Sequence, residues 1–198
     1  MMRGSLLAVA ALLVGACSGP PPNAPPTPTP SPTSTPSPAP TPSPSAASVG
    51  RIFTAAELTK TGGCGDVYLW AATEDDTFAV VVIWEGAATE AVEAGSFEET
   101  VELPDERVTV TLQTGAKLSQ GLCNDIILPD YRVDGEAPAV GGTVSLNVQP
   151  NGDEVFDTAA ADLTLTNIEF DIVFGTETEQ WLVESLELED VLVGWLAG

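Results

Sequence analysis

The sequence contains no histidine and little positive charge, and both absences limit what it can do. Histidine is the most common general base in enzymes and the most common ligand of transition metals, so the usual serine triad and the usual zinc sites cannot be assembled. Only six residues are Lys or Arg, against 29 Asp or Glu. This imbalance repels phosphate backbones, so we expect no nucleic-acid partner.

Acidic residues are also absent from the first part of the chain, and this divides the sequence. Arg3 is the only charged residue before Arg51, and all acidic residues follow Arg51. Residues 48–198 therefore carry a formal charge of −24. Their length, roughly 150 residues, suits one acidic domain with its own hydrophobic core.

The first 17 residues have the order of an export signal. A positive start at Arg3 precedes an apolar run at 6–14, which is too short to span a bilayer but fits the hydrophobic region of a signal peptide. The run ends in Val14, Gly15, Ala16 and Cys17, which resembles the bacterial lipobox. The resemblance extends only to residue 17 and implies that the signal peptide 1–16 is removed and Cys17 is lipidated. An ordinary secretory signal, with Cys17 incidental, is the alternative.

Residues 17–47 would then begin at the lipidated cysteine and continue as a tether of proline alternating with threonine or serine. Proline favours extended polyproline II chain, with about 3.1 Å per residue. Two acyl chains, such as palmitate, suffice for stable anchoring in the membrane. The composition and the stalk resemble lipoproteins of high-GC Gram-positive bacteria, which implies a place on the outer face of the cell membrane.

Two cysteines remain once Cys17 is set aside. Export places Cys64 and Cys123 in an oxidising compartment, where such a pair forms a disulfide bond. A redox or catalytic role is disfavoured, because the two are not spaced Cys-x-x-Cys and no histidine is present to activate a thiol.

The domain is predicted to be all-β, an antiparallel β-sandwich of about seven or more strands with one short N-terminal helix. The helix follows from the Thr54/Glu57 capping box and ends near Gly62. Apolar runs at 66–72 and 77–84, joined by a turn at 73–76, predict a hairpin of central strands. Segment 87–101 is interpreted as a loop with one helical turn. Further strands are predicted at 107–113, 143–148, 162–174 and 181–195, with a turn at 151–152.

The last predicted strand contains a change of parity. Leu186 and Leu188 alternate with polar residues, but Val191 and Val193 have the opposite parity, across Glu189 and Asp190. One inserted residue restores the apolar side chains to one face, so we interpret the change as a β-bulge.

Candidate functional residues are few. Acidic clusters offer Asp75, Asp76, Asp153 and Asp157 as calcium ligands, although no EF-hand loop is present. Trp70 and Trp84 lie in the most apolar strands and are expected in the core. Trp181 and Trp195 begin and end the last strand, so they are the candidates for a binding surface.

These patterns favour a non-enzymatic protein. We expect no catalytic residue and no cofactor. The expected function is that of a membrane-anchored, extracytoplasmic lipoprotein whose β-domain is a binding or structural module for an envelope protein or a cell-wall polymer. Two alternatives are a calcium- or other cation-binding domain and an envelope carbohydrate-active enzyme that uses paired carboxylates.

Overall fold

A computed structural model describes residues 49–126, 128–152 and 158–194. The predicted signal peptide, Cys17 and the tether lie outside these residues. The described part contains strands and two short helices, and none of its helices is long and apolar enough to cross a membrane. The elements are β1 (Val49–Phe53), β2 (Lys60–Cys64), β3 (Tyr68–Ala72), β4 (Phe78–Trp84), α1 (Ala87–Ala94), β5 (Phe97–Glu102), β6 (Val108–Ala116), α2 (Leu118–Gly121), β7 (Arg132–Pro150), β8 (Ala159–Phe174) and β9 (Glu177–Val193).

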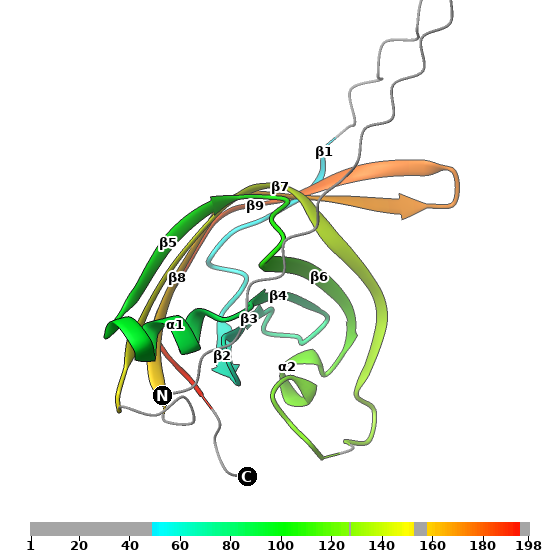
Figure 1. Cartoon of the computed structure of the whole chain (residues 1–198). Coiled ribbons are helices and arrows are strands. Elements are labelled where there is room, and N and C mark those ends of the chain that lie inside the picture. The colour runs from blue at the N-terminus through cyan, green and yellow to red at the C-terminus, as the bar shows by residue number, and fades with distance from the viewer. Residues whose placement is uncertain (1–48, 127, 153–157, 195–198) are drawn as a thin grey trace, which may run out of the picture. The chain divides into compact units, whose positions relative to one another are not determined.

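The described strands form one curled sheet in the order β1-β9-β8-β7-β6-β4-β3-β2, with β5 also paired to β7 (Figure 1). The strand β7 is long enough to change neighbours, because its first part pairs with β6 and its later part pairs with β5. A mostly β domain is confirmed, whereas a two-sheet sandwich is not. The expectation that all strands are antiparallel is wrong, because β1 pairs with β9 in parallel.

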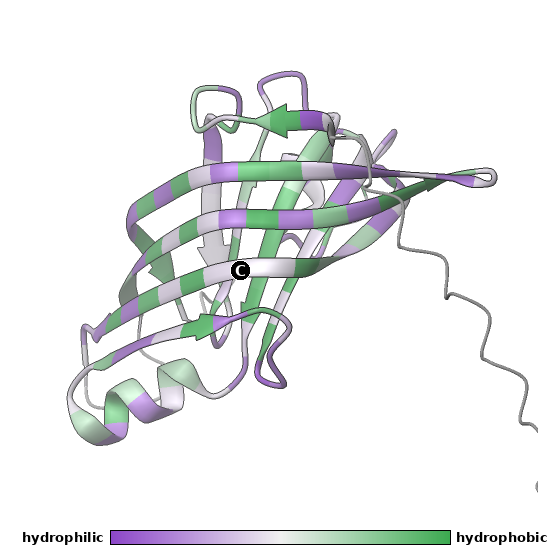
Figure 2. Cartoon of the chain, turned by 90° about the horizontal axis from the view of Figure 1, so that it is seen from above, coloured by the Kyte–Doolittle hydropathy of each residue, from purple (hydrophilic) through white to green (hydrophobic). Residues whose placement is uncertain are grey.

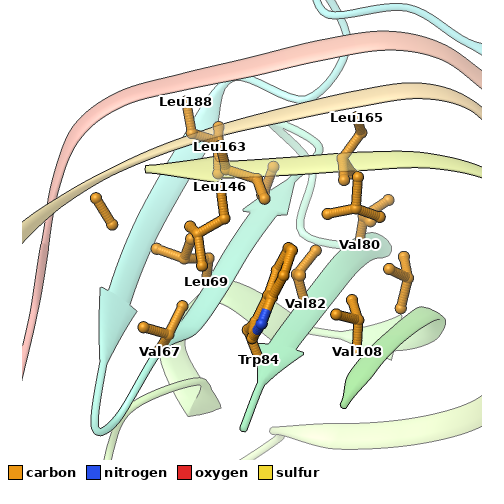
Figure 3. Packing of buried hydrophobic residues seen from close by; sticks show 14 of the residues in the cluster. Val67, Leu69, Val80, Val82, Trp84, Val108, Leu146, Leu163, Leu165 and Leu188 are labelled. Atoms are coloured by element: carbon orange, nitrogen blue, oxygen red, sulfur yellow. The ribbon is translucent and has the colours of Figure 1, made fainter. Parts of the chain in front are cut away.

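The main core lies inside the curl of the sheet. Leucines of β7, β8 and β9 meet Leu69, Val80, Val82 and Trp84 of β3 and β4 (Figure 3). Hydropathy alternates along the long strands, which bury one face only (Figure 2). By contrast, β4 is apolar on both faces because both are covered, Val80 by the main core and Val81 by a smaller cluster. The predicted central hairpin of β3 and β4 is therefore confirmed.

The predicted β-bulge is also confirmed. Ala161 of β8 faces Val191 and Leu163 faces Leu188, so Glu189 and Asp190 together stand opposite a single residue, Asp162. Asp190 has a φ of 54°, and its backbone N–H donates to the Asp162 carboxylate at 2.9 Å. All four apolar residues around the bulge, Leu186, Leu188, Val191 and Val193, are buried.

The predicted N-terminal helix is wrong. The Thr54 N–H does donate to the Glu57 carboxylate at 3.0 Å, as in a capping box, but a single turn forms and the chain continues into β2. Pairing of β2 with β3 outweighs a helix that Gly62 and Gly63 would weaken.

Segment 87–101, interpreted as a loop with one helical turn, instead forms the helix α1 and most of the strand β5. The Asp66 carboxylate accepts hydrogen bonds from the Gly86 and Ala88 N–H groups, both at 3.1 Å, and so satisfies donors at the start of the helix. Gly95, with a φ of 87°, ends it. The residue that stabilises α1 is thus about two strands away in the sequence, outside the reach of local pattern analysis.

Candidate functional site

The predicted disulfide bond between Cys64 and Cys123 is present and marks one candidate site. Cys64 is the last residue of β2, and Cys123 follows α2; their Cα atoms are 5.8 Å apart. This distance lies within the range of about 4.4–6.8 Å that the geometry of a disulfide allows. The bond fixes the loop after α2 against the edge of the sheet that β2 forms.

A groove of about 620 Å³ lies beside this bond. Its side-chain walls come from Tyr68 of β3, Gln113 of β6 and Tyr131, just before β7. Cys64 and Tyr68 are opposite each other in the β2–β3 pair, which brings the disulfide bond and the first phenol to the same place. The remaining lining residues are the two cysteines with Gly63, Gly65, Gly121, Leu122, Asn124, Asp125 and Gly194.

The groove is supported by a second, smaller core on the outer face of the sheet. Leu69 and Ala71 of β3 point into the main core, so Tyr68 and Trp70 stand on the opposite face. There α2 and the following loop bury a cluster of apolar residues, against which Tyr68, Trp70 and Tyr131 pack. Gly121 allows the close approach of Tyr131, because a Cβ there would lie 2.1 Å from the phenol ring. The buried members are Ala72, Ala79, Val81, Leu118 and Leu122.

The polar groups around the groove are neutral or acidic. Gln113 donates from Nε2 to the Glu136 carboxylate at 2.8 Å, whereas its Oε1 is buried and has no hydrogen-bond partner among the described residues. Burial, the neighbouring Tyr131 and Glu136 together raise the pKa of the Tyr68 phenol to about 12. The phenol is therefore neutral at physiological pH, and can both donate and accept hydrogen bonds.

A second candidate is the end of the β8–β9 hairpin, residues 171–179, which we call the projecting hairpin (Figure 1). Pairing of β7 with β8 ends at Phe170, and pairing of β1 with β9 starts at Gln180, so in the described structure both outer edges of the projecting hairpin are unpaired. Near its tip, Val173 is 68% exposed and Phe174 is 53% exposed.

An aromatic cluster of Phe53, Phe78 and Trp181 lies at the base of the projecting hairpin, and the ring of Phe174 reaches back from near the tip to Trp181. Neighbouring ring centroids among these four residues are 5.4 to 6.1 Å apart. The Arg51 guanidinium lies 4.4 Å from the ring centroid of Phe53 and 4.3 Å from that of Phe78. Trp181, predicted for a binding surface, is thus half-buried where the hairpin leaves the core; Trp195 lies outside the described residues.

The predicted calcium ligands are not brought together where the structure describes them. The Asp75 carboxylate accepts hydrogen bonds from the Thr73 and Thr77 hydroxyls, which lower its pKa. Asp76 is paired with Lys60 at 3.1 Å. No group of three acidic or other metal-ligating residues is gathered within the described ranges, and Asp153 and Asp157 lie outside them. The calcium hypothesis remains a prediction.

Sequence reasoning found one part of each site, the Cys64–Cys123 pair beside the groove and Trp181 at the base of the projecting hairpin, and missed the rest. The sequence does contain a signal for the projecting hairpin: the apolar pair Val173 and Phe174 stands directly before Gly175, at a turn, where few other residues can cover apolar side chains. At the groove, the cysteine pair was detectable, but no local pattern indicates that Tyr68, Gln113 and Tyr131 come together beside it. Comparison with known proteins adds no assignment: no family model, no curated protein and no solved structure matches this chain.

Proposed function

We propose that this chain is a lipid-anchored protein on the outer face of a bacterial cell membrane, and that its β-domain binds a protein partner through the projecting hairpin. The observation that carries the binding role is the exposure of Val173 and Phe174 at the end of a ribbon with two unpaired edges. Export and anchoring are supported by the lipobox resemblance at 14–17 and by the disulfide bond, which forms in oxidising compartments. A tether on the order of 80 Å long would let the domain reach away from the membrane.

An isolated two-stranded ribbon is marginally stable in water, and exposed apolar side chains on one mark an interaction site. The projecting hairpin carries its apolar side chains on both faces. Ile172 and Phe174 continue the core face from Trp181, whereas Val173 is on the opposite face. A partner that covers the ribbon removes this surface from water and pairs its free edges, which is the geometry of strand addition.

The charges around the tip restrict the partner. On the paired strand, Glu177 stands opposite Phe174 and Glu179 stands opposite Ile172. A third acidic residue, Asp171, directly precedes the apolar run 172–174. This acidic rim repels anionic lipid headgroups, and it repels a second copy of a domain with a charge of −24. The partner we propose is therefore a protein with an apolar centre and a basic rim.

The test is site-specific photo-crosslinking of the full chain in its own cells. Benzoylphenylalanine is placed at Phe174 or, as the control, at Leu192, which lies on the same strand pair and is 44% exposed. We expect a discrete adduct with one basic protein from position 174 only. The adduct should weaken with Glu177→Gln and Glu179→Gln together, and it should be lost in a Cys17→Ala variant that is released from the membrane.

Equal adducts from both positions, or none, would overturn the hairpin as the binding surface. Unchanged labelling of Cys17→Ala by a fatty-acid analogue would overturn the anchor. Glu179→Gln keeps an acceptor for the Trp181 indole N–H, which donates to Glu179 at 3.2 Å, so the charge is removed without losing that hydrogen bond.

A further inference from the structure

We propose that a strand of the partner pairs with one edge of the projecting hairpin, residues 171–174 of β8, and that this strand combines apolar side chains with a basic one. The proposal rests on the protein partner inferred above. It goes further by assigning one of the two unpaired edges and the sequence pattern that pairs with it. An unpaired strand edge presents a row of free N–H and C=O groups, which makes it a template for a further strand.

This edge, called the β8 edge below, is open because β7 leaves it. Ala139 of β7 pairs with Phe170 of β8, whereas the adjacent Pro138 already pairs with Thr111 of β6. From this fork onward, β7 bends away from the projecting hairpin (Figure 1). A partner strand can therefore take the place beside residues 171–174 that β7 gives up.

The opposite edge of the projecting hairpin, residues 177–179 of β9, is less accessible because β1 begins beside it. Val49 of β1 pairs with Gln180. The Glu179 side chain lies against Gly50, where an added Cβ would be 3.0 Å from the Glu179 Cβ. A strand that approaches Glu179 from this side would therefore meet β1. Only residues 177 and 178 remain open on the β9 side.

The β8 edge also has few of the charges that keep exposed edges from pairing. Charged side chains on an edge strand are a common protection against the addition of another strand. Among the described strands, β5 pairs only with β7, and it carries Glu98, Glu99 and Glu102. On the β8 edge, by contrast, Asp171 is followed by the apolar run 172–174. This contrast favours the β8 edge, rather than β5, as the place where a strand is added.

The side chains along the β8 edge determine the pattern of the added strand. Side chains alternate between the two faces of a sheet, and residues opposite each other on paired strands are neighbours. Ile172 and Phe174 share one face, so the residues beside them should be apolar. Asp171 and Val173 share the other face, so the residue beside Val173 should be apolar and the one beside Asp171 should be basic. The β9 partner of Asp171 is the neutral Gln180, so its charge is not offset across the ribbon.

The test maps cross-links residue by residue in the full chain, in its own cells. A diazirine amino acid, which reacts only with atoms in contact with it, is placed at position 172, 173 or 174. Position 178 is the control, because Thr178 is exposed and stands opposite Val173 on the other strand of the ribbon. We expect the three β8 positions to link to one continuous segment of one protein, with the linked residue moving by one for each step of the probe. Position 178 should give little adduct.

A synthetic peptide of the linked segment then tests backbone pairing with the chain released by Cys17→Ala. A strand directs the N–H groups of alternate residues to each side, so N-methylation of one alternate set should matter and that of the other should not. The loss expected for each methylated residue in the paired set is about tenfold, which corresponds to about 1.4 kcal/mol. Asp171→Lys should weaken binding, whereas Glu98→Lys, which changes the net charge equally on β5, should not.

The outcomes separate this proposal from the one on which it rests. Adducts from position 174 whose linked residues are scattered over the partner, or equal adducts from 173 and 178, would overturn pairing at the β8 edge but leave the protein partner intact. The same conclusion would follow if N-methylation of either alternate set had equal effects. Links to a second copy of this chain would replace the basic partner with self-association. No adduct from any of the four positions would overturn both proposals.

Discussion

Removal of the disulfide bond should destabilise the domain by about 4 kcal/mol. The bond joins residues 59 positions apart, and the chain-entropy model gives this value for the freedom that a loop of this length regains in the unfolded chain. Cys123 is exposed and Cys64 is half-buried, so replacing both with serine removes little packing from the folded state. The loss is a large part of the 5–15 kcal/mol typical of a single domain.

The assay is urea denaturation followed by tryptophan fluorescence. The oxidised protein is compared with its reduced form and with the Cys64→Ser/Cys123→Ser variant, all in a Cys17→Ala background so that no other thiol is present. The reduced form and the double variant should unfold at similar, lower urea concentrations. The m-value should rise, because the unfolded chain without the cross-link exposes more surface. A loss below about 1 kcal/mol, or free thiols in the oxidised folded protein, would refute this reasoning.

Two further predictions concern single positions. Gly142 has a φ of 116°, and a Cβ there would lie 2.6 Å from the Asn167 carbonyl oxygen, so Gly142→Ala should lower the free energy of unfolding by about 3 kcal/mol. Gly175 also has a positive φ but has open space around it, so Gly175→Ala should lower the free energy of unfolding by only about 1 kcal/mol. Both values are measured by the same urea denaturation. The pKa of Tyr68 is raised to about 12 from 10.0, so its neutral form is favoured in the folded state. The folded state therefore loses free energy of unfolding when Tyr68 must ionise: its stability should be unaffected by Tyr68 below pH 10 and should fall as the pH rises toward 12. Absorbance at 295 nm should show one phenol titrating near pH 12 that Tyr68→Phe removes; its titration near pH 10 would contradict the burial argument.

The features predicted well from the sequence are those that depend on neighbouring residues. Strand period identified the segments that became β3, β4, β6, β8, β9 and the later part of β7, whose first part was missed, and the parity change across Glu189 and Asp190 identified the bulge. The disulfide bond followed from counting the cysteines that remain after Cys17. In each case the deciding information lies within one strand or in composition, so no knowledge of the partner strands was required.

The features that were missed depend on residues far apart in the sequence. The parallel pairing of β1 with β9 joins the two ends of the domain, with Ile52 next to Leu182. The capping box at Thr54 predicted a helix that β2 prevents, and α1 begins where Asp66 supplies its acceptor. Local propensity is a small free-energy term, and pairing and distant hydrogen bonds exceed it in both places.

The projecting hairpin was also missed because its exposure depends on a strand that is distant in the sequence. Strand β8 reads as one amphipathic strand through Phe170, Ile172 and Phe174, and nothing in its own sequence separates a buried member from an exposed one. Phe170 is fully buried in the main core, at the last β8 residue that pairs with β7, whereas Phe174 lies beyond that pairing and is exposed. Along β8, the change from a buried to an exposed apolar side chain therefore follows the end of the β7 pairing. A strand that continues in an apolar pattern past its last partner has surface that its own fold does not cover, and in this domain that surface is the projecting hairpin.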